Sequence, residues 1–420
     1  MINQRVFIGA RWLRLAAVLS ALILVLLMAA CGSGQPSTTN TSGVKNRAFI
    51  TNTYSGNLQI VDTQNDTTSY TQQTTNSAGQ IIPGEPVTIA VASTVTLEAE
   101  GPGHATTAIY DPSTFAVYFV TNSTEMIAGN AAASSAISQM LYSTDSTTVY
   151  AAEPNISVSG ATRPGGVEAL NVTSFGTTAT YAVPSARYLS LSPNGQYLFV
   201  FANNSDSLWL INLQASTVTP VEIPGFARPI SAFFSSDNNT AYVLNCGPEC
   251  GSSGPASVAF FDIPSQTITG NVPVGGASVG LLNGTTLYVA GSPVPPGTTS
   301  TYDAVDVSGR ARLTPNSVAI GDGFHTTMAL STNKRLFIGA ATCSNMVTGC
   351  LSVVDTTTNT AEASLPPQGA VTSLLAITNR DVVYAVEGGL LHIYSSDTDM
   401  LMGAQLIFTG ALSTIVQVDP

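Results

Sequence analysis

The sequence has 420 residues, of which 44% are hydrophobic and only 9% are charged, and its formal net charge is −12. Low charge with high hydrophobicity disfavours a disordered chain, and the scarcity of Glu, Lys and Arg disfavours long surface helices. The acidic balance argues against nucleic acid as a partner, because phosphates require a basic protein face. Short strands joined by Thr-, Ser-, Asn- and Gly-rich turns fit this composition, and the length allows a large core in one or two domains.

The first thirty residues have the pattern of a secretory signal, because three arginines precede an apolar run at 15–30. The segment resembles a lipoprotein signal, in which residues 27–31, LMAAC, stand for the lipobox, with Met28 where leucine is usual. The resemblance implies removal of residues 1–30 and acylation of Cys31, which would anchor the chain in a membrane through lipid. An uncleaved transmembrane anchor is the alternative, and the remainder of the chain is exported in either case.

Residues 31–45 are expected to comprise the lipidated cysteine and a flexible tether, since 32–43 lack both periodicity and large apolar side chains. Loss of the three arginines of the signal lowers the net charge from −12 to about −15. Gly32 does not resemble the inner-membrane retention signal of some bacteria. We therefore expect the outer membrane or the cell surface rather than the inner membrane.

From residue 46 onward the sequence repeats with a period of about 45 residues. Four segments with strand character form the clearest copy, 228–273, and they lie at 228–234, 240–245, 257–263 and 266–272. Further copies lie at 187–223, 326–365 and 371–408, with looser ones at 277–318, 136–183 and 87–122.

The first repeat lacks a first strand, because 47–53, 58–63 and 67–73 correspond to the second, third and fourth strands of a copy. Residues 413–420 have the missing strand and the start of its turn. The sequence therefore predicts an all-β protein, a β-propeller of seven or eight four-stranded blades over 46–420, closed by pairing of the C-terminal strand with the N-terminal blade. Seven blades would result if 87–122 were an irregular insertion. A linear solenoid is the structural alternative, but it would require polar caps at both ends.

A recurring tetrad appears in the expected second strands, as FITN (49–52), FVTN (119–122) and YVLN (242–245). The expected third strands end in Asp followed by a polar turn, as in IVDTQND (60–66) and VVDTTTN (353–359). The chain thus resembles the YVTN family of β-propellers, found in exported and surface-layer proteins of bacteria and archaea. The motif is structural, since β-branched and aromatic residues pack the sheet while Asn and Asp form turns. The resemblance implies a fold and an extracytoplasmic location but no particular activity.

Four cysteines besides Cys31 form two local pairs, and each pair lies between the expected second and third strands of a copy. In an exported chain such pairs predict disulfides, which would close loops of five and eight residues. A metal site built from all four thiols is one alternative, and a redox role for CGPEC, whose three intervening residues depart from CxxC, is another. The predicted disulfides are Cys246–Cys250 and Cys343–Cys350.

The sequence contains no recognisable catalytic or metal-binding motif: the three histidines form no HExxH or HxxxH pattern, and GxSxG and P-loop motifs are absent. We therefore expect no metal, no cofactor and no catalytic residue. Residues just before the inner strands of a propeller line one mouth of its centre, and Arg187, Arg228 and His325 occupy such places. Together they would bind a carboxylate or a phosphate. The alternative is that each is a solvated rim residue or pairs with a neighbour such as Asp322.

These features favour a lipid-anchored, extracytoplasmic binding or scaffold module for an envelope protein, a glycan or a small anionic ligand. The alternative is an enzyme of the lactonase or periplasmic dehydrogenase-subunit type, for which acidic residues near the ends of second strands, Glu153, Glu249 and Glu387, would have to converge. A third possibility is an accessory lipoprotein of β-barrel insertion, although the tetrads are not the signature of those propellers.

Overall fold

The computed structural model describes residues 42–68, 74–75, 81–82, 87–293, 300–343, 350–362, 365, 368–402 and 411–419, all within the unit Thr41–Pro420. The predicted signal, Cys31 and most of the predicted tether lie outside these residues. Ser42 and Val44, at the end of the predicted tether, are buried against the body of the protein. Within the described residues no helix has the length and hydrophobicity needed to cross a bilayer.

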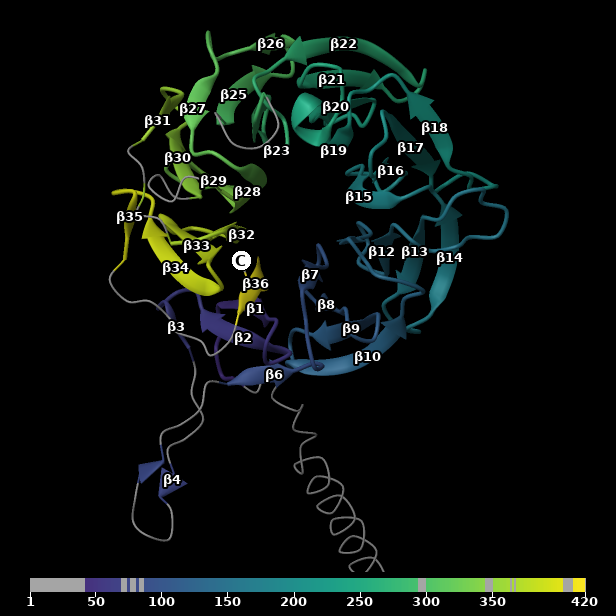
Figure 1. Cartoon of the computed structure of the whole chain (residues 1–420). Helices are drawn as coiled ribbons and strands as arrows, with labels where there is room; N and C mark the ends of the chain where they lie inside the picture. Colours follow the sequence, from purple (N-terminus) through teal and green to yellow (C-terminus); the bar gives the residue numbers. More distant parts are fainter. Residues whose placement is uncertain are drawn as a thin grey trace, which may run out of the picture. The chain divides into compact units, whose positions relative to one another are not determined.

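Eight antiparallel sheets form a ring of blades, which confirms the predicted β-propeller with eight rather than seven blades (Figure 1). From the innermost strand outward, blade one contains β36 (Leu412–Gln417), β1 (Arg47–Asn52), β2 (Asn57–Asp62), β3 (Thr67–Thr68) and β6 (Thr88–Ala90); blade two β7 (Leu97–Glu100), β8 (Thr106–Asp111), β9 (Ala116–Thr121) and β10 (Met126–Ala132); blade three β11 (Gln139–Tyr142), β12 (Thr148–Glu153), β13 (Gly166–Asn171) and β14 (Thr177–Ala182); and blade four β15 (Ala186–Leu191), β16 (Tyr197–Ala202), β17 (Ser207–Asn212) and β18 (Val221–Pro224).

The remaining blades follow the same order. Blade five contains β19 (Pro229–Phe234), β20 (Thr240–Asn245), β21 (Ser257–Asp262) and β22 (Thr267–Pro273); blade six β23 (Val279–Asn283), β24 (Thr286–Gly291), β25 (Ser300–Asp306), β26 (Ala311–Arg312) and β27 (Val318–Ile320); blade seven β28 (Phe324–Leu330), β29 (Arg335–Thr342), β30 (Leu351–Asp355) and β31 (Thr360–Ala361); and blade eight β32 (Val371–Ala376), β33 (Val382–Glu387), β34 (Leu390–Ser395) and β35 (Met400–Leu401). A separate two-stranded sheet pairs β4 (Thr74–Thr75) with β5 (Ile81–Ile82).

The hydrophobic core of the described residues consists of eight clusters, and each cluster lies between two neighbouring blades. Strand β20 shows how one strand serves two of them. Ala241 and Val243 pack against blade four, whereas Tyr242 and Leu244 pack against blade six. Because successive side chains of a strand point to opposite faces, a blade buried on both faces requires a continuous apolar run, which the second and third strands have.

The ring closes through β36 and β1, as predicted. The two strands are antiparallel, with Phe49 opposite Val416 and Ile50 opposite Ile415. Side chains of blades one and eight form a continuous cluster across this closure. A linear solenoid has no such contact between its ends, so this alternative is excluded.

Hydrogen bonds between neighbouring blades satisfy backbone groups on the inner strands. The amide N–H of Leu189 donates to Oε1 of Gln139 (2.6 Å), and the N–H of Ala232 donates to Oγ of Ser190 (3.0 Å). Each such bond gives a partner to a backbone donor on the open edge of an innermost strand, where the sheet itself offers none.

The structure corrects two details of the expected strand order. Residues 88–90, expected in the inner part of the second copy, form β6 at the outer edge of blade one, where Ile89 lies opposite Leu58. Blade two consequently begins only at Leu97, and the FVTN tetrad at 119–122 lies at the end of its third strand rather than its second. Strand β6 pairs with Asn57–Gln59 of β2, whereas β3 pairs with Val61 and Asp62 further along the same strand, so the two segments share the outer edge of the sheet.

Candidate functional site

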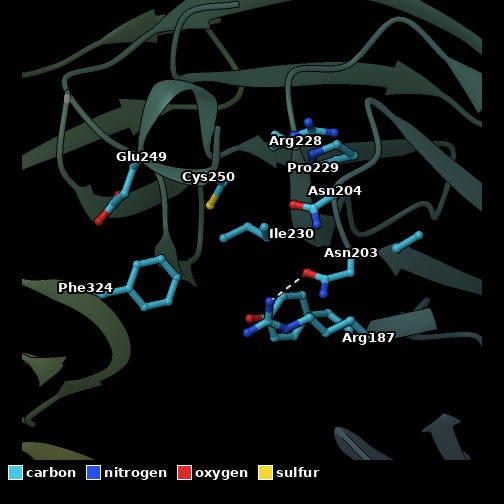
Figure 2. Close-up of a pocket in the computed structure, with 11 residues that line it drawn as sticks. Arg187, Asn203, Asn204, Arg228, Pro229, Ile230, Glu249, Cys250 and Phe324 are labelled. Atoms are coloured by element: carbon cyan, nitrogen blue, oxygen red, sulfur yellow. Dashed lines mark hydrogen bonds between the residues drawn. The ribbon is translucent and has the colours of Figure 1, made fainter. Parts of the chain in front are cut away.

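The front face of the ring is the face at which the first strand of each blade begins and the second strand ends. A pocket with a volume of about 310 Å³ opens there, between blades four, five and seven (Figure 2). It is lined by Arg187, Tyr188, Ala202, Asn203, Asn204, Arg228, Pro229, Ile230, Glu249, Cys250 and Phe324.

Arg187 is the second residue of β15 and lies at a bulge, because Ala186 pairs with Ala202 while Tyr188 pairs with Phe201. Its Nη1 donates a hydrogen bond to Oδ1 of Asn203 (2.8 Å), and its guanidinium lies 4.9 Å from the centre of the Tyr188 ring. These contacts orient the side chain without neutralising its charge.

Arg228 directly precedes β19 and has a φ of 53°, a left-handed conformation that is costly for a side chain of this size. Hydrogen bonds on both sides hold the backbone there: its N–H donates to Oδ1 of Asp206 (3.0 Å), and its carbonyl accepts from Cys246 (3.0 Å). The guanidinium itself lies 3.8 Å from Asp206, beyond hydrogen-bonding distance. Its Nε is buried and has no hydrogen-bond partner within the described part of the chain.

The two pocket arginines differ from the other buried or half-buried arginines, whose donors are taken up by carboxylates and carbonyls. Arg335 contacts three carboxylates, and Arg380 holds Asp66 with both terminal nitrogens. The arginines engaged in this way are Arg47, Arg312, Arg335 and Arg380. Arg187 and Arg228 therefore retain donors that a bound anion could use.

The disulfide Cys246–Cys250 is formed, as is Cys343–Cys350, so both predicted pairings are confirmed. The first closes the short 3₁₀ helix η1 (Gly247–Cys250), which follows β20 and brings Cys250 to the pocket. The second lies between β29 and β30 and is not among the residues that line the pocket. The four thiols are used in disulfides, which excludes the alternative of a metal site built from them.

Glu249 projects from the same helix, and Figure 2 shows its carboxyl group turned away from the two arginines. Its Oε2 accepts a hydrogen bond from the amide of Ser292 in blade six (2.8 Å), whereas its Oε1 is buried without a partner among the described residues. Burial raises the pKa of Glu249 to about 7, and the hydrogen bond from Ser292 opposes this shift. Glu249 thus joins the disulfide turn to the next blade.

The other expected residues lie elsewhere. His325 is buried in β28, and burial lowers its pKa to about 4, whereas its neighbour Phe324 lines the pocket. Glu153 and Glu387 are buried in blades three and eight, where Glu153 lies beside Glu168 and Glu387 accepts hydrogen bonds from side chains of its own blade. The three glutamates do not converge. Among the described ranges no three His, Cys, Asp or Glu side chains gather in a way that suits a metal ion.

Arg187 and Arg228 do line the same pocket, although they are offset by two positions. The pairing of Pro229 with Asn245 makes Pro229 the equivalent of Ala186, so Arg228 corresponds to the residue before β15 rather than to Arg187. Seven lining residues were not predicted, namely Tyr188, Ala202, Asn203, Asn204, Pro229, Ile230 and Phe324. Three of them, Tyr188, Pro229 and Phe324, are sequence neighbours of a predicted site residue at the start of an inner strand. Ligand binding by Arg187, Arg228 and His325 stays a prediction.

No family model matches the chain, and no curated protein matches it. Solved structures similar to it include dihydro-heme d1 dehydrogenase NirN in complex with DHE (TM-score 0.64, 11% identity, covering 89% of this chain and 75% of that one). Another is Kuenenia stuttgartiensis hydrazine synthase (TM-score 0.52, 15% identity, covering 73% of this chain and 94% of that one). A third is the computationally designed Ika8 protein (TM-score 0.54, 10% identity, covering 77% of this chain and 92% of that one). Since these neighbours include enzymes and a designed protein at such low identity, the similarity shows that the chain is a β-propeller and does not extend to function.

Proposed function

We propose that this protein is an exported, lipid-anchored β-propeller that binds a small anionic ligand in the pocket on its front face. Of the partners that the sequence allows, namely an envelope protein, a glycan or a small anion, the pocket supports the anion. The observation that carries the proposal is the presence of Arg187 and Arg228 in one pocket of about 310 Å³, both with donors to spare. That volume lies at the small end of the range for ligand sites.

Export rests on the signal-like segment at 1–30, on the lipobox resemblance before Cys31, and on two disulfides, which persist in oxidising compartments. A Cys31→Ser variant tests the anchor. We expect the variant to be released from the membrane fraction, and retention in that fraction would refute lipid anchoring at this residue.

Isothermal titration of the intact protein with a panel of small anions, among them acetate, phenylacetate and inorganic phosphate, tests the binding proposal. The double variant Arg187→Ala/Arg228→Ala should lose at least tenfold in affinity, because two charge-assisted interactions disappear. Arg163→Ala, which removes one positive charge from an exposed position outside the pocket, is the control for each arginine. Absence of any anion binding, or unchanged binding in the double variant, would refute the proposal.

A further inference from the structure

The pocket on the front face has two chemically different sides. Arg187, Asn203, Asn204 and Arg228 come from blades four and five and present amide and guanidinium groups. Ile230 and Phe324 present hydrocarbon, and Figure 2 shows the ring of Phe324 on the side opposite Arg228, with Ile230 between them. Pro229 lies beside Arg228, and Glu249 lies on the same side as Phe324. A ligand that fills the volume must therefore match an anionic or polar group at one end and an apolar body at the other.

The donors available for an anion are side chains rather than backbone amides. The N–H of Ala227 donates to Oδ1 of Asn245, that of Arg228 to Asp206, and that of Asn203 to the carbonyl of Ser185. Protein sites for phosphate commonly use a nest of free backbone amides or the start of a long helix. The three backbone amides that flank the pocket arginines are occupied here, so the planar forks of Arg187 and Arg228 are left as the main donors.

A planar guanidinium matches a carboxylate with two parallel hydrogen bonds. Arg228 has its Nε buried and unbonded among the described residues, and no acid lies within 3.5 Å of its guanidinium there. The nearest carboxyl of the lining, that of Glu249, is turned away and tied to Ser292. A bound carboxylate would compete at Arg228 with Asp206, whose ion pair at 3.8 Å lacks a hydrogen bond, and at Arg187 with the neutral amide oxygen of Asn203.

From this arrangement we infer that the ligand class is a monocarboxylate with a compact apolar body, bound with its carboxylate at Arg187 and Arg228 and its body against Ile230 and Phe324. The inference rests on the proposed function and narrows it from small anions to one class. Each methylene buried against the apolar side contributes about fourfold in affinity.

Four probes with matched parts test the inference by titration of the intact protein: phenylacetate, acetate, phenyl phosphate and phenylacetamide. Phenylacetate should bind at least tenfold more tightly than each of the others, because only it combines a carboxylate with an apolar body. Phenyl phosphate as tight as phenylacetate would overturn the carboxylate assignment while leaving anion binding in place. Acetate as tight as phenylacetate would overturn the apolar part, and no binding of any anion would refute the proposed function itself.

Two variants separate the two sides of the pocket. Phe324→Ala should weaken phenylacetate about tenfold and leave acetate unchanged, and Ile230→Thr provides a smaller truncation should the first variant fold poorly. Arg228→Lys keeps the charge but removes the planar fork, so it should weaken phenylacetate at least fivefold and leave phenyl phosphate nearly unaffected. Equal losses for both head groups in Arg228→Lys would overturn the carboxylate assignment.

Discussion

Arg47 and Asp419 lie 372 residues apart in the sequence and form a two-point ion pair where the ring closes. Nε of Arg47 lies 2.5 Å from Oδ2 of Asp419, and Nη2 donates to Oδ1 (3.0 Å). The remaining Nη1 of the same guanidinium contacts Glu125 (3.0 Å) and the carbonyl of Asn122 in blade two. One buried arginine thus connects the C-terminal segment, the first blade and the second.

Arg47→Met should destabilise the protein by about 3 kcal/mol, because removal of one partner leaves the fully buried carboxylate of Glu125 without its cation. Asp419→Asn should cost only about 1 kcal/mol, since the side chain of Asp419 is 30% exposed. Denaturation by urea measures both values. An equal loss of unfolding free energy in the two variants would contradict the conclusion that the contact of Arg47 with Glu125 stabilises the protein more than its contact with Asp419.

Deletion of 412–420 should abolish cooperative unfolding, because it removes the innermost strand of blade one and exposes the edge of β1. The matched control keeps these residues but moves 412–419 ahead of residue 42, where the strand can still pair with β1. That permuted chain should fold and bind as the parent does, with a lower unfolding midpoint because the two ends of the ring no longer interlock. Scanning calorimetry and size-exclusion chromatography distinguish these outcomes.

The contribution of Glu153 to the stability of the protein should fall as the pH rises from about 4.5 to 8. Burial and the neighbouring Glu168 raise the pKa of Glu153 to about 8, so the folded state holds a proton that the unfolded state releases. Stability from this group is complete below its ordinary pKa and is lost as the pH rises through the folded value. Glu153→Gln mimics the protonated acid, so it should match the parent at pH 4.5 and exceed it by roughly 2 to 4 kcal/mol at pH 9.

Urea titrations at intervals between pH 4.5 and 9 check this prediction. Glu222→Gln, which changes an exposed glutamate in the outer strand β18, is the control and should retain the pH slope of the parent. A pH slope in Glu153→Gln equal to that of the parent would show that Glu153 is ionised in the folded protein.

Opening the disulfide Cys246–Cys250 should weaken anion binding, whereas opening Cys343–Cys350 should not. Each double Cys→Ser variant should lose about 2 kcal/mol of stability, because each disulfide closes a short loop. Only the first disulfide borders the pocket, where it holds Cys250 and Glu249. Titration of the two variants with phenylacetate compares their affinities directly. Equal affinity in both would show that the disulfide turn at 246–250 does not contribute to ligand binding.

Ring closure could be predicted from the sequence because it depends on a local pattern. Residues 413–418 have the pattern of a first strand followed by a turn, and residues 47–52 have that of a second strand. The C-terminal segment therefore supplies the first strand that the N-terminal blade lacks. The outer edge of blade one could not be predicted in the same way. Ile89 reaches β2 from beyond the period of the repeat, and only tertiary pairing determines where such a segment returns.

The arginines of the candidate site were predictable because the start of an inner strand is visible in the repeat. The direction in which the His325 side chain points was harder to predict. Adjacent residues of a strand face opposite sides, and register shifts flank this position. Phe324 therefore lines the pocket while His325 enters the blade. Nη1 of Arg228 lies 3.8 Å from Oδ1 of Asp206, too far for a hydrogen bond, so this donor is not used by Asp206. No sequence pattern predicts such a distance.

The partnership of β36 with β1 also sets an order for biosynthesis. Strand β1 emerges long before its neighbour β36, so blade one must wait with an unpaired strand until the last of the chain has followed. During that interval the open edge of β1 offers a template for misassembly with other chains, and the contacts that end the wait join residues far apart in the sequence, which form slowly. Folding in quantity should therefore depend on chaperones that shield the first blade until β36 has emerged.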